Sequence, residues 1–195
     1  MKHSATRSAS RWCARSLPIL CLLLAGVLGA SSVTLTPEGD KAMAFDLKSS
    51  AFTAGADIPK KFACEGPDVS PALSWGDPPA GTKSISLIMD DPDAPAGIWV
   101  HWVLYDLPAS ARELPEGVPK DHELKNGARQ GRNDFGKIGY GGPCPPPGRP
   151  HRYFFKLYAL SAKTDLKAGA TKAELEKAMR GHILGQVELM GRYKR

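Results

Sequence analysis

Carboxylate, imidazole and phenol groups gather in three short segments of the sequence, and together these groups could bind an anion. Asp91 and Asp93 lie in a proline-rich run, His101 lies in an apolar segment, and His151 is followed two residues later by Tyr153. Protonated imidazole and phenolic O–H groups donate hydrogen bonds, whereas carboxylates orient imidazoles and favour their charged form. The residue types therefore indicate a pocket for a phosphate or carboxylate ligand.

Each of these segments also has a purely structural interpretation. The run Asp90–Pro95 is typical of a solvated turn, although its two prolines would also stiffen it. A lone histidine in an apolar strand, such as His101, is commonly a core residue bonded to the backbone. His151 could belong to a turn at the start of a strand. The occurrence of three such polar groups in one small chain favours the pocket.

The loop before His151 is a candidate for the remaining wall of the pocket. Gly139–Pro146 consists mostly of glycine and proline, so its backbone N–H groups could approach a ligand closely, and Tyr140 could form an aromatic wall. This segment ends the stretch Ser110–Arg149, which we expect to be mostly loop. Long loops in compact domains tend to carry function.

Three predicted strands must position these groups. Ser84–Met89, Trp99–Leu107 and Arg152–Leu160 are rich in apolar residues, and glycine and proline interrupt the chain at intervals of about 8–12 residues. This pattern is typical of an all-β sandwich or barrel. Trp99–Leu107 is apolar on both faces apart from one histidine, which predicts a central strand covered on both sides.

Side-chain alternation predicts the faces on which two of the polar groups lie. Asp91 falls on the apolar face of the strand that precedes it, and a buried carboxylate there requires a partner. His101 falls on the same face as Trp99, Val103 and Tyr105.

The C-terminus is the one part of the sequence with a strong helical pattern. Thr171 and Glu174 have the spacing of a capping box, and apolar residues follow at helical intervals: Leu175, Met179, Ile183, Val187 and Met190. We therefore expect a C-terminal helix. Gly181 and Gly185 weaken this pattern and leave open a break or a close packing onto the sheet.

The N-terminus has the three parts of a secretory signal peptide. Residues 1–15 carry four basic and no acidic side chains, the apolar run Leu17–Leu28 follows, and small residues come next. We expect a signal peptide at 1–31, a flexible lead-in at 32–42, and one domain at 43–195, in a periplasmic or secreted protein. Alternatively, translation starts at Met43 and the protein is cytoplasmic. The apolar run is short for a bilayer span, so stable membrane insertion is not expected.

The net charge of +6 does not indicate a nucleic-acid-binding protein. Four of the 26 basic residues belong to the predicted signal peptide, so the mature chain carries 22 basic and 20 acidic residues, a net charge of +2. The mature sequence contains no basic stripe.

Two of the four cysteines, Cys64 and Cys144, remain after removal of the signal peptide. An exported protein can form disulfides, so these two cysteines are predicted to be bridged. The alternative is two separate thiols, buried as small apolar groups.

Four motifs resemble those of the phosphatidylethanolamine-binding protein family, in its bacterial Raf-kinase-inhibitor-like branch. Asp91–Pro95 followed by Trp99–Trp102 is similar to the first signature of the family. Gly139–Pro143, then Gly148 and His151–Tyr153, is similar to the second. Two shorter segments that match the bacterial branch are Ser70–Trp75 and Asn133–Lys137. The resemblance extends over about Phe45 to Arg192.

The resemblance implies a Greek-key antiparallel β fold with peripheral helices and one anion pocket. Many bacterial members are dimers, so the resemblance also implies a homodimer. Carried over by position, the residues implied for the pocket are Asp91, Asp93, Trp99, His101, Tyr140, Gly142, Pro143, His151 and Tyr153. Family members bind phosphate, acetate or phosphoethanolamine-like groups there, and eukaryotic relatives regulate kinases or inhibit proteases.

The sequence favours a ligand-binding protein that is not an enzyme and needs no cofactor. No serine or cysteine stands beside a base in a nucleophile motif, and no phosphate-binding glycine loop with a following lysine is present. Its ligand would be a small anion or a phospholipid head group, with an unidentified protein as a further partner. One alternative is an inhibitor of a kinase or protease that acts by surface contact. A weaker alternative is a metal-assisted hydrolase in which His101, His151 and an aspartate hold zinc.

Overall fold

The computed structural model describes residues 45–195. The predicted signal peptide at 1–31, the lead-in at 32–42 and the first two residues of the predicted domain lie outside this range. Among the described residues, no helix has the length and apolar character needed to cross a membrane.

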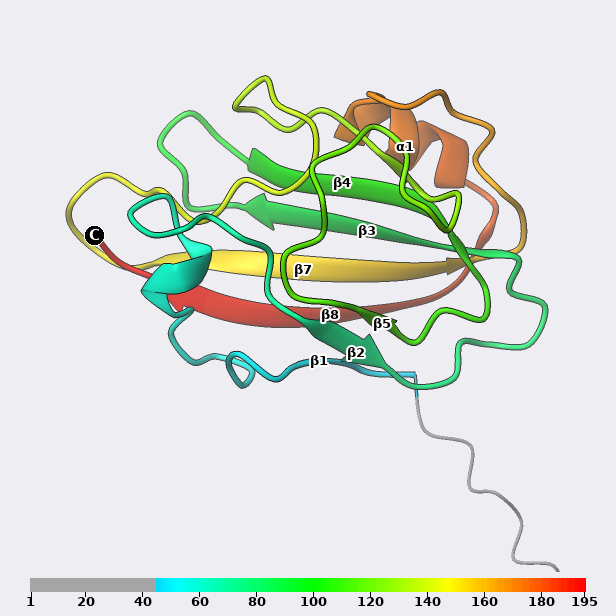
Figure 1. Ribbon diagram of the computed structural model, residues 1–195, viewed down its shortest axis with the longest axis horizontal. Helices are drawn as coiled ribbons and strands as arrows, with labels where there is room; N and C mark the ends of the chain where they lie inside the picture. Colours follow the sequence, from blue (N-terminus) through cyan, green and yellow to red (C-terminus); the bar gives the residue numbers. More distant parts are fainter. Residues whose placement is uncertain (1–44) are drawn as a thin grey trace, which may run out of the picture. The chain divides into compact units, whose positions relative to one another are not determined.

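The described chain forms two antiparallel sheets (Figure 1). The larger sheet has the strand order β6-β4-β3-β7-β8, and the smaller one has the order β1-β2-β5. The strands are β1 Leu47–Ser49, β2 Leu73–Trp75, β3 Ser84–Asp91, β4 Trp99–Pro108, β5 Glu113–Leu114, β6 Arg129–Gln130, β7 His151–Leu160 and β8 Ile183–Tyr193. The predicted mainly β, sandwich-like fold is confirmed, and β3, β4 and β7 correspond to the three predicted strands.

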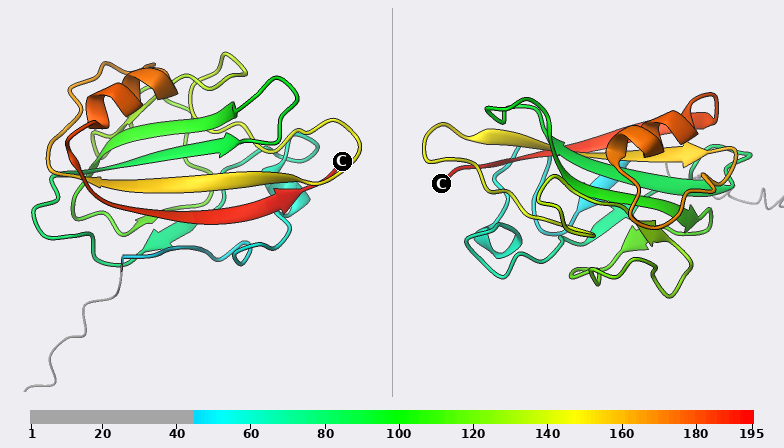
Figure 2. Two further views of the ribbon diagram at one scale, coloured as in Figure 1. Left: turned by 180° about the vertical axis from the view of Figure 1, so that it is seen from behind. Right: turned by 90° about the horizontal axis from the view of Figure 1, so that it is seen from above.

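Two apolar clusters cover the two faces of the larger sheet. The first joins both sheets and includes Leu73 and Leu114 from the smaller sheet, with Leu87 and Phe155 from the larger one. The second lies on the other face, beneath the helix α1 (Lys172–Met179), which Figure 2 shows beside the end of the large sheet. Because both faces are covered, all eight residues of β3 are buried, as in a central strand. The prediction of a doubly covered strand for β4 is confirmed as well.

The expected C-terminal helix is correct only in its first two turns. Thr171 and Glu174 form the predicted capping box, but the helix ends at Met179. Gly181 then takes a positive φ of 79°, which turns the chain back, and Ile183–Tyr193 pairs with β7 as strand β8. The helical interpretation of Ile183–Met190 was therefore wrong.

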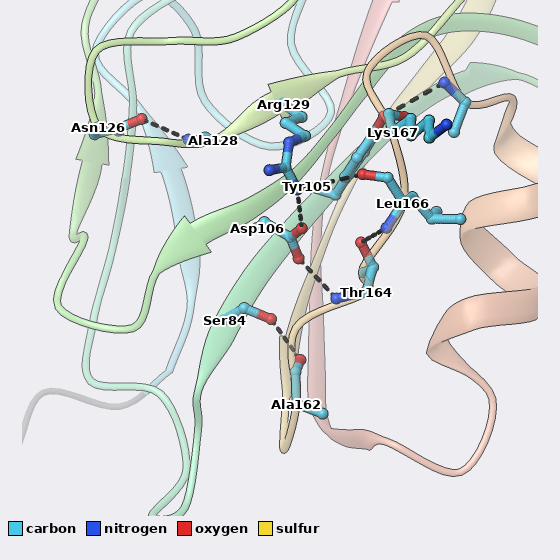
Figure 3. A network of polar contacts seen from close by, with 11 residues as sticks. Ser84, Tyr105, Asp106, Asn126, Ala128, Arg129, Ala162, Thr164, Leu166 and Lys167 are labelled. Carbon is cyan, nitrogen blue, oxygen red and sulfur yellow. Dashed lines mark hydrogen bonds and ion pairs between the residues drawn. The ribbon is translucent and has the colours of Figure 1, made fainter.

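Buried polar contacts tie the connection between β7 and α1 to the large sheet (Figure 3). Asp106, a buried residue with a φ of 58°, accepts a hydrogen bond from the N–H of Thr164 at 2.8 Å. The guanidinium of Arg129 lies 3.5 Å from the same carboxylate. The Tyr105 hydroxyl donates to the carbonyl of Lys167 at 2.6 Å. These contacts hold the connection in place, so α1 remains seated on the sheet face that it covers.

Candidate functional site

A cavity of about 230 Å³ lies where β3 ends and where β4 and β7 begin. Strand β3 is antiparallel to both β4 and β7, so its last residues lie beside the first residues of those two strands. Asp91 pairs directly with Trp99. The residues that line the cavity are Asp91, Ala94, Pro95, Ala96, Trp99, His101, Phe135, Cys144, Pro145, Pro146 and His151. Four of the nine predicted ligand-binding residues are among them.

Asp91 and His151 form a buried pair in the wall of this cavity. The Nδ1 atom of His151 lies 2.7 Å from Oδ2 of Asp91, and the two side chains are only 5% and 4% exposed. The other carboxylate oxygen accepts a hydrogen bond from the backbone N–H of Asp93 at 2.8 Å. The carboxylate therefore fixes the orientation of the imidazole and leaves its Nε2 atom for a ligand.

His101 reaches the cavity because β4 contains a bulge. Met89 pairs with Trp102, but the next residue of β3 pairs with Val100, so His101 is an extra residue in its strand. A bulge of this kind re-aims side chains. Val103 and Tyr105 pack in the cluster under α1, whereas His101 lines the cavity with Trp99. The prediction that His101 shares a face with Val103 and Tyr105 was therefore wrong, because alternation does not continue through a bulge.

The imidazole of His101 is buried and bonded to the backbone. Its Nδ1 atom lies 2.7 Å from the carbonyl oxygen of Gly141, so Nδ1 carries the proton and Nε2 remains for a ligand. Burial lowers the pKa of His101 below its ordinary value of 6.5, although the hydrogen bond to Gly141 and the charge of Asp91 oppose this effect. In the absence of a ligand His101 is therefore neutral at pH 7.

One buried hydrogen-bond donor beside the cavity, the Nε1–H of Trp99, has no partner among the described residues. The ring of Tyr153 lies edge-on to His101, at 5.2 Å between ring centroids, and burial and the charge of Asp91 raise the pKa of its hydroxyl. A buried donor without a partner costs about 1–3 kcal/mol, so a ligand oxygen that reached the Trp99 Nε1–H would be stabilised.

Asp93 lies beside the cavity but does not line it. Its two carboxylate oxygens accept hydrogen bonds from Nε and NH2 of Arg152 at 2.9 and 2.8 Å. These bonds hold the pKa of Asp93 well below its usual range. Asp93 therefore links the loop that follows β3 to the start of β7, next to the buried pair.

The other three predicted residues hold the loop that follows Gly139 in place. Tyr140 is buried in the core, where its hydroxyl donates to the carbonyl of Phe62 at 2.7 Å. The N–H of Gly142 donates to Oδ1 of Asp68 at 2.6 Å, and the carbonyl of Pro143 accepts from Cys64 at 3.1 Å. None of the three residues lines the cavity, and contact between any of them and a ligand stays a prediction.

The same loop is crosslinked to the segment on which it rests. Cys64 and Cys144 form a disulfide, with 5.4 Å between their Cα atoms, which confirms the predicted bridge. Cys144 itself lines the cavity, together with the two prolines that follow it. The disulfide thus holds one wall of the cavity.

Phe135 is the main cavity residue that was not predicted as a site residue. Its ring meets the rings of Trp99 and His101 edge-on, with centroids 5.4 and 5.3 Å apart. It lies at the tip of a turn in the long loop, 38% exposed. The turn-forming sequence Asn133–Gly136 was the available signal, but nothing in it says which strand the turn will contact.

Metal ligands are not gathered at this cavity. Within residues 45–195, no three histidine, cysteine, aspartate or glutamate side chains lie close enough together to hold a metal ion.

The described chain is similar to known proteins over most of its length. Residues 48–194 match the family model described as phosphatidylethanolamine-binding protein. A UPF0098 protein of Aquifex aeolicus is 53% identical over 149 residues, which cover 75% of this chain and 86% of that protein. The crystal structure of Escherichia coli YbcL, described as a member of the mammalian PEBP family, is 35% identical with a TM-score of 0.73 and covers 77% of this chain and 98% of YbcL. A homolog from Chlamydia trachomatis is 43% identical with a TM-score of 0.72, covering 79% and 99% of the two chains.

Proposed function

The chain belongs to the phosphatidylethanolamine-binding protein family, and we propose that it reversibly binds a small anion in the cavity without catalysing a reaction. The observation that carries this proposal is the arrangement of the two imidazoles. The Nδ1 atoms of His101 and His151 are engaged by Gly141 and Asp91, so both Nε2 atoms are left for one ligand. A phosphate, a carboxylate or a phosphoethanolamine-like head group has the oxygen atoms that this arrangement can bind.

The composition of the cavity supports binding over catalysis. Its lining contains no serine or threonine, and its one cysteine, Cys144, is held in the disulfide. Covalent catalysis by a hydroxyl or thiol requires that group next to a base. His151 has no serine, threonine or free cysteine beside it in the cavity lining. The alternative of a metal-assisted hydrolase would need a set of metal ligands, and residues 45–195 contain no group of three that could hold a metal ion.

Substitution of the buried pair tests the proposal. We expect phosphate to bind the purified mature chain in calorimetric titration, and Asp91→Asn and His151→Gln to weaken binding by about ten- to a hundredfold, because charge-assisted hydrogen bonds contribute about 1.5–3 kcal/mol. His182→Gln is a matched control, since His182 lies outside the cavity and its side chain is within hydrogen-bond distance of Ser161, at 3.3 Å. Undiminished phosphate affinity in both pair variants, or no binding by a folded wild type, would refute the proposal.

The lowered pKa of His101 predicts the direction of a pH effect. An anion that accepts a hydrogen bond from Nε2–H favours the protonated ring, so binding at this site takes up a proton. We expect the affinity for sulfate, whose own charge is constant in this range, to rise as the pH falls through and below 6.5. The measurement is sulfate titration from pH 8 to 5, with His101→Gln expected to reduce the slope. His151 and Asp91 also line the cavity, so the wild-type and His101→Gln profiles are compared over the same pH range. A flat profile in the wild type would contradict proton-linked binding.

We further propose that the mature protein acts in the periplasm or outside the cell. The predicted signal peptide at 1–31 motivates this proposal, and the disulfide is consistent with it, because disulfides persist in oxidising compartments. Homodimerisation and regulation of a protein partner are proposals that rest on the family alone.

A further inference from the structure

We propose that the cavity selects anions with a short apolar substituent over zwitterionic ones such as phosphoethanolamine, and that Phe135 determines this selectivity. The inference rests on the proposed anion binding and names the class of ligand within it. A monoalkyl phosphate has the predicted chemistry: an anionic head for the histidines and a hydrocarbon group for the rest of the cavity.

The size and lining of the cavity call for more than a bare anion. Its volume of about 230 Å³ lies just below the range of about 300–1,000 Å³ that is typical for drug-sized ligands, which suits a small organic anion. Beyond the Asp91, Trp99 and histidine side chains, the wall is almost entirely apolar. It consists of Ala94, Pro95, Ala96, Phe135, Pro145 and Pro146, with Cys144, whose sulfur is held in the disulfide. An apolar group on the ligand would be removed from water against this wall.

No carboxylate in the cavity is left over to pair with an ammonium group. Asp91 is the one acidic residue in the lining, and its two oxygens are already engaged by His151 and by the N–H of Asp93. Asp93 is bound through both oxygens to Arg152. A ligand ammonium buried in the cavity would therefore lose water without gaining a free counter-charge from the lining, which is unfavourable.

A turn held by hydrogen bonds positions Phe135 in the lining of the cavity. Oδ1 of Asn133 accepts hydrogen bonds from the N–H groups of Phe135 and Lys137, both at 3.1 Å. Oδ2 of Asp134 accepts from the N–H of Val100 at 2.7 Å, which attaches the turn to β4. A Cβ atom on Gly141 would lie 2.8 Å from the ring, so glycine there leaves room for Phe135. The aromatic ring is thus held, partly exposed, next to the histidine that would bind the anionic head.

A matched pair of ligands tests the selectivity. Propyl phosphate and phosphoethanolamine differ in that a methyl group replaces the ammonium, and inorganic phosphate reports the anion site alone. We expect the wild type to bind propyl phosphate about tenfold more tightly than phosphoethanolamine, since a small buried apolar area accounts for a factor of this size. Phe135→Ala should reduce the preference for propyl phosphate over inorganic phosphate about fivefold, while Phe135→Leu should restore most of that preference.

The controls separate this inference from the proposed function. Ile98→Ala removes another exposed apolar side chain, 58% exposed, that does not line the cavity, and it should change none of the three affinities. Equal or tighter binding of phosphoethanolamine, as a cation resting on the aromatic face would produce, overturns the selectivity while phosphate binding still supports the anion site. A uniform loss of all three ligands in Phe135→Ala overturns the assigned role of Phe135. Failure of the folded wild type to bind any of the three overturns the proposed function and the inference together.

Discussion

Replacing Gly142 with alanine is expected to destabilise the protein by about 3 kcal/mol, as overpacking of a tight contact does, and to abolish anion binding at the concentrations used for the wild type. A Cβ atom at this position would lie 2.1 Å from the carbonyl oxygen of Phe62 and 2.9 Å from Cα of Ala63. Both neighbours are backbone atoms and cannot rotate away, so the loop must move off the segment that it contacts. Such a movement breaks the hydrogen bond from Gly142 to Asp68 and displaces the cavity wall around Cys144.

Urea unfolding followed by circular dichroism, together with phosphate titration, measures both effects. Gly148→Ala is the matched control in the same loop, because Gly148 has open space around its Cα atom but a φ of 147°. It should lose about 1 kcal/mol from backbone strain and keep its phosphate affinity. If Gly142→Ala were as stable as the wild type, the close approach of the loop to Phe62 would be wrong.

Much of the fold could be predicted from the sequence because its signals are local. Strands β3, β4 and β7 are long apolar runs bounded by turn residues, and the capping box at Thr171 is a contact between residues three positions apart. The beginning of β8 could not be predicted in this way. Its apolar residues also fit a helical spacing, and only pairing with β7, in which Leu160 lies opposite Ile183, decides between helix and strand.

The candidate site shows the same division between local and long-range information. The residues that could bind an anion were identified by type, and β3, β4 and β7 bring Asp91, His101 and His151 to one cavity. The bulge that turns His101 toward the cavity depends on the register between two strands, which no local pattern specifies. The position of Phe135 is likewise determined by the bond between Asp134 and Val100, 34 residues apart.

Loss of the disulfide is expected to lower the free energy of unfolding at least as much as Gly142→Ala does. The bridge joins residues 80 positions apart, and closing a loop of that length stabilises a folded chain by about 4 kcal/mol in the chain-entropy account. The double variant Cys64→Ser/Cys144→Ser should therefore unfold at a markedly lower urea concentration than the wild type. Its phosphate affinity should also fall, because Cys144, Pro145 and Pro146 form one wall of the cavity and lose their covalent attachment.

Reducing the disulfide of the wild type measures the effect of losing the crosslink without the two serine substitutions. A dithiol reductant should shift the unfolding midpoint of the wild type to that of the double variant and leave the double variant unchanged. The bonds from Tyr140 to Phe62 and from Gly142 to Asp68 remain after reduction, so the folded loop should keep part of its order and bind phosphate weakly at high concentration. Because ligand and disulfide both favour the same loop conformation, saturating phosphate should slow reduction of the bridge. Equal midpoints for oxidised and reduced wild type would show that the loop is held by its hydrogen bonds and packing alone.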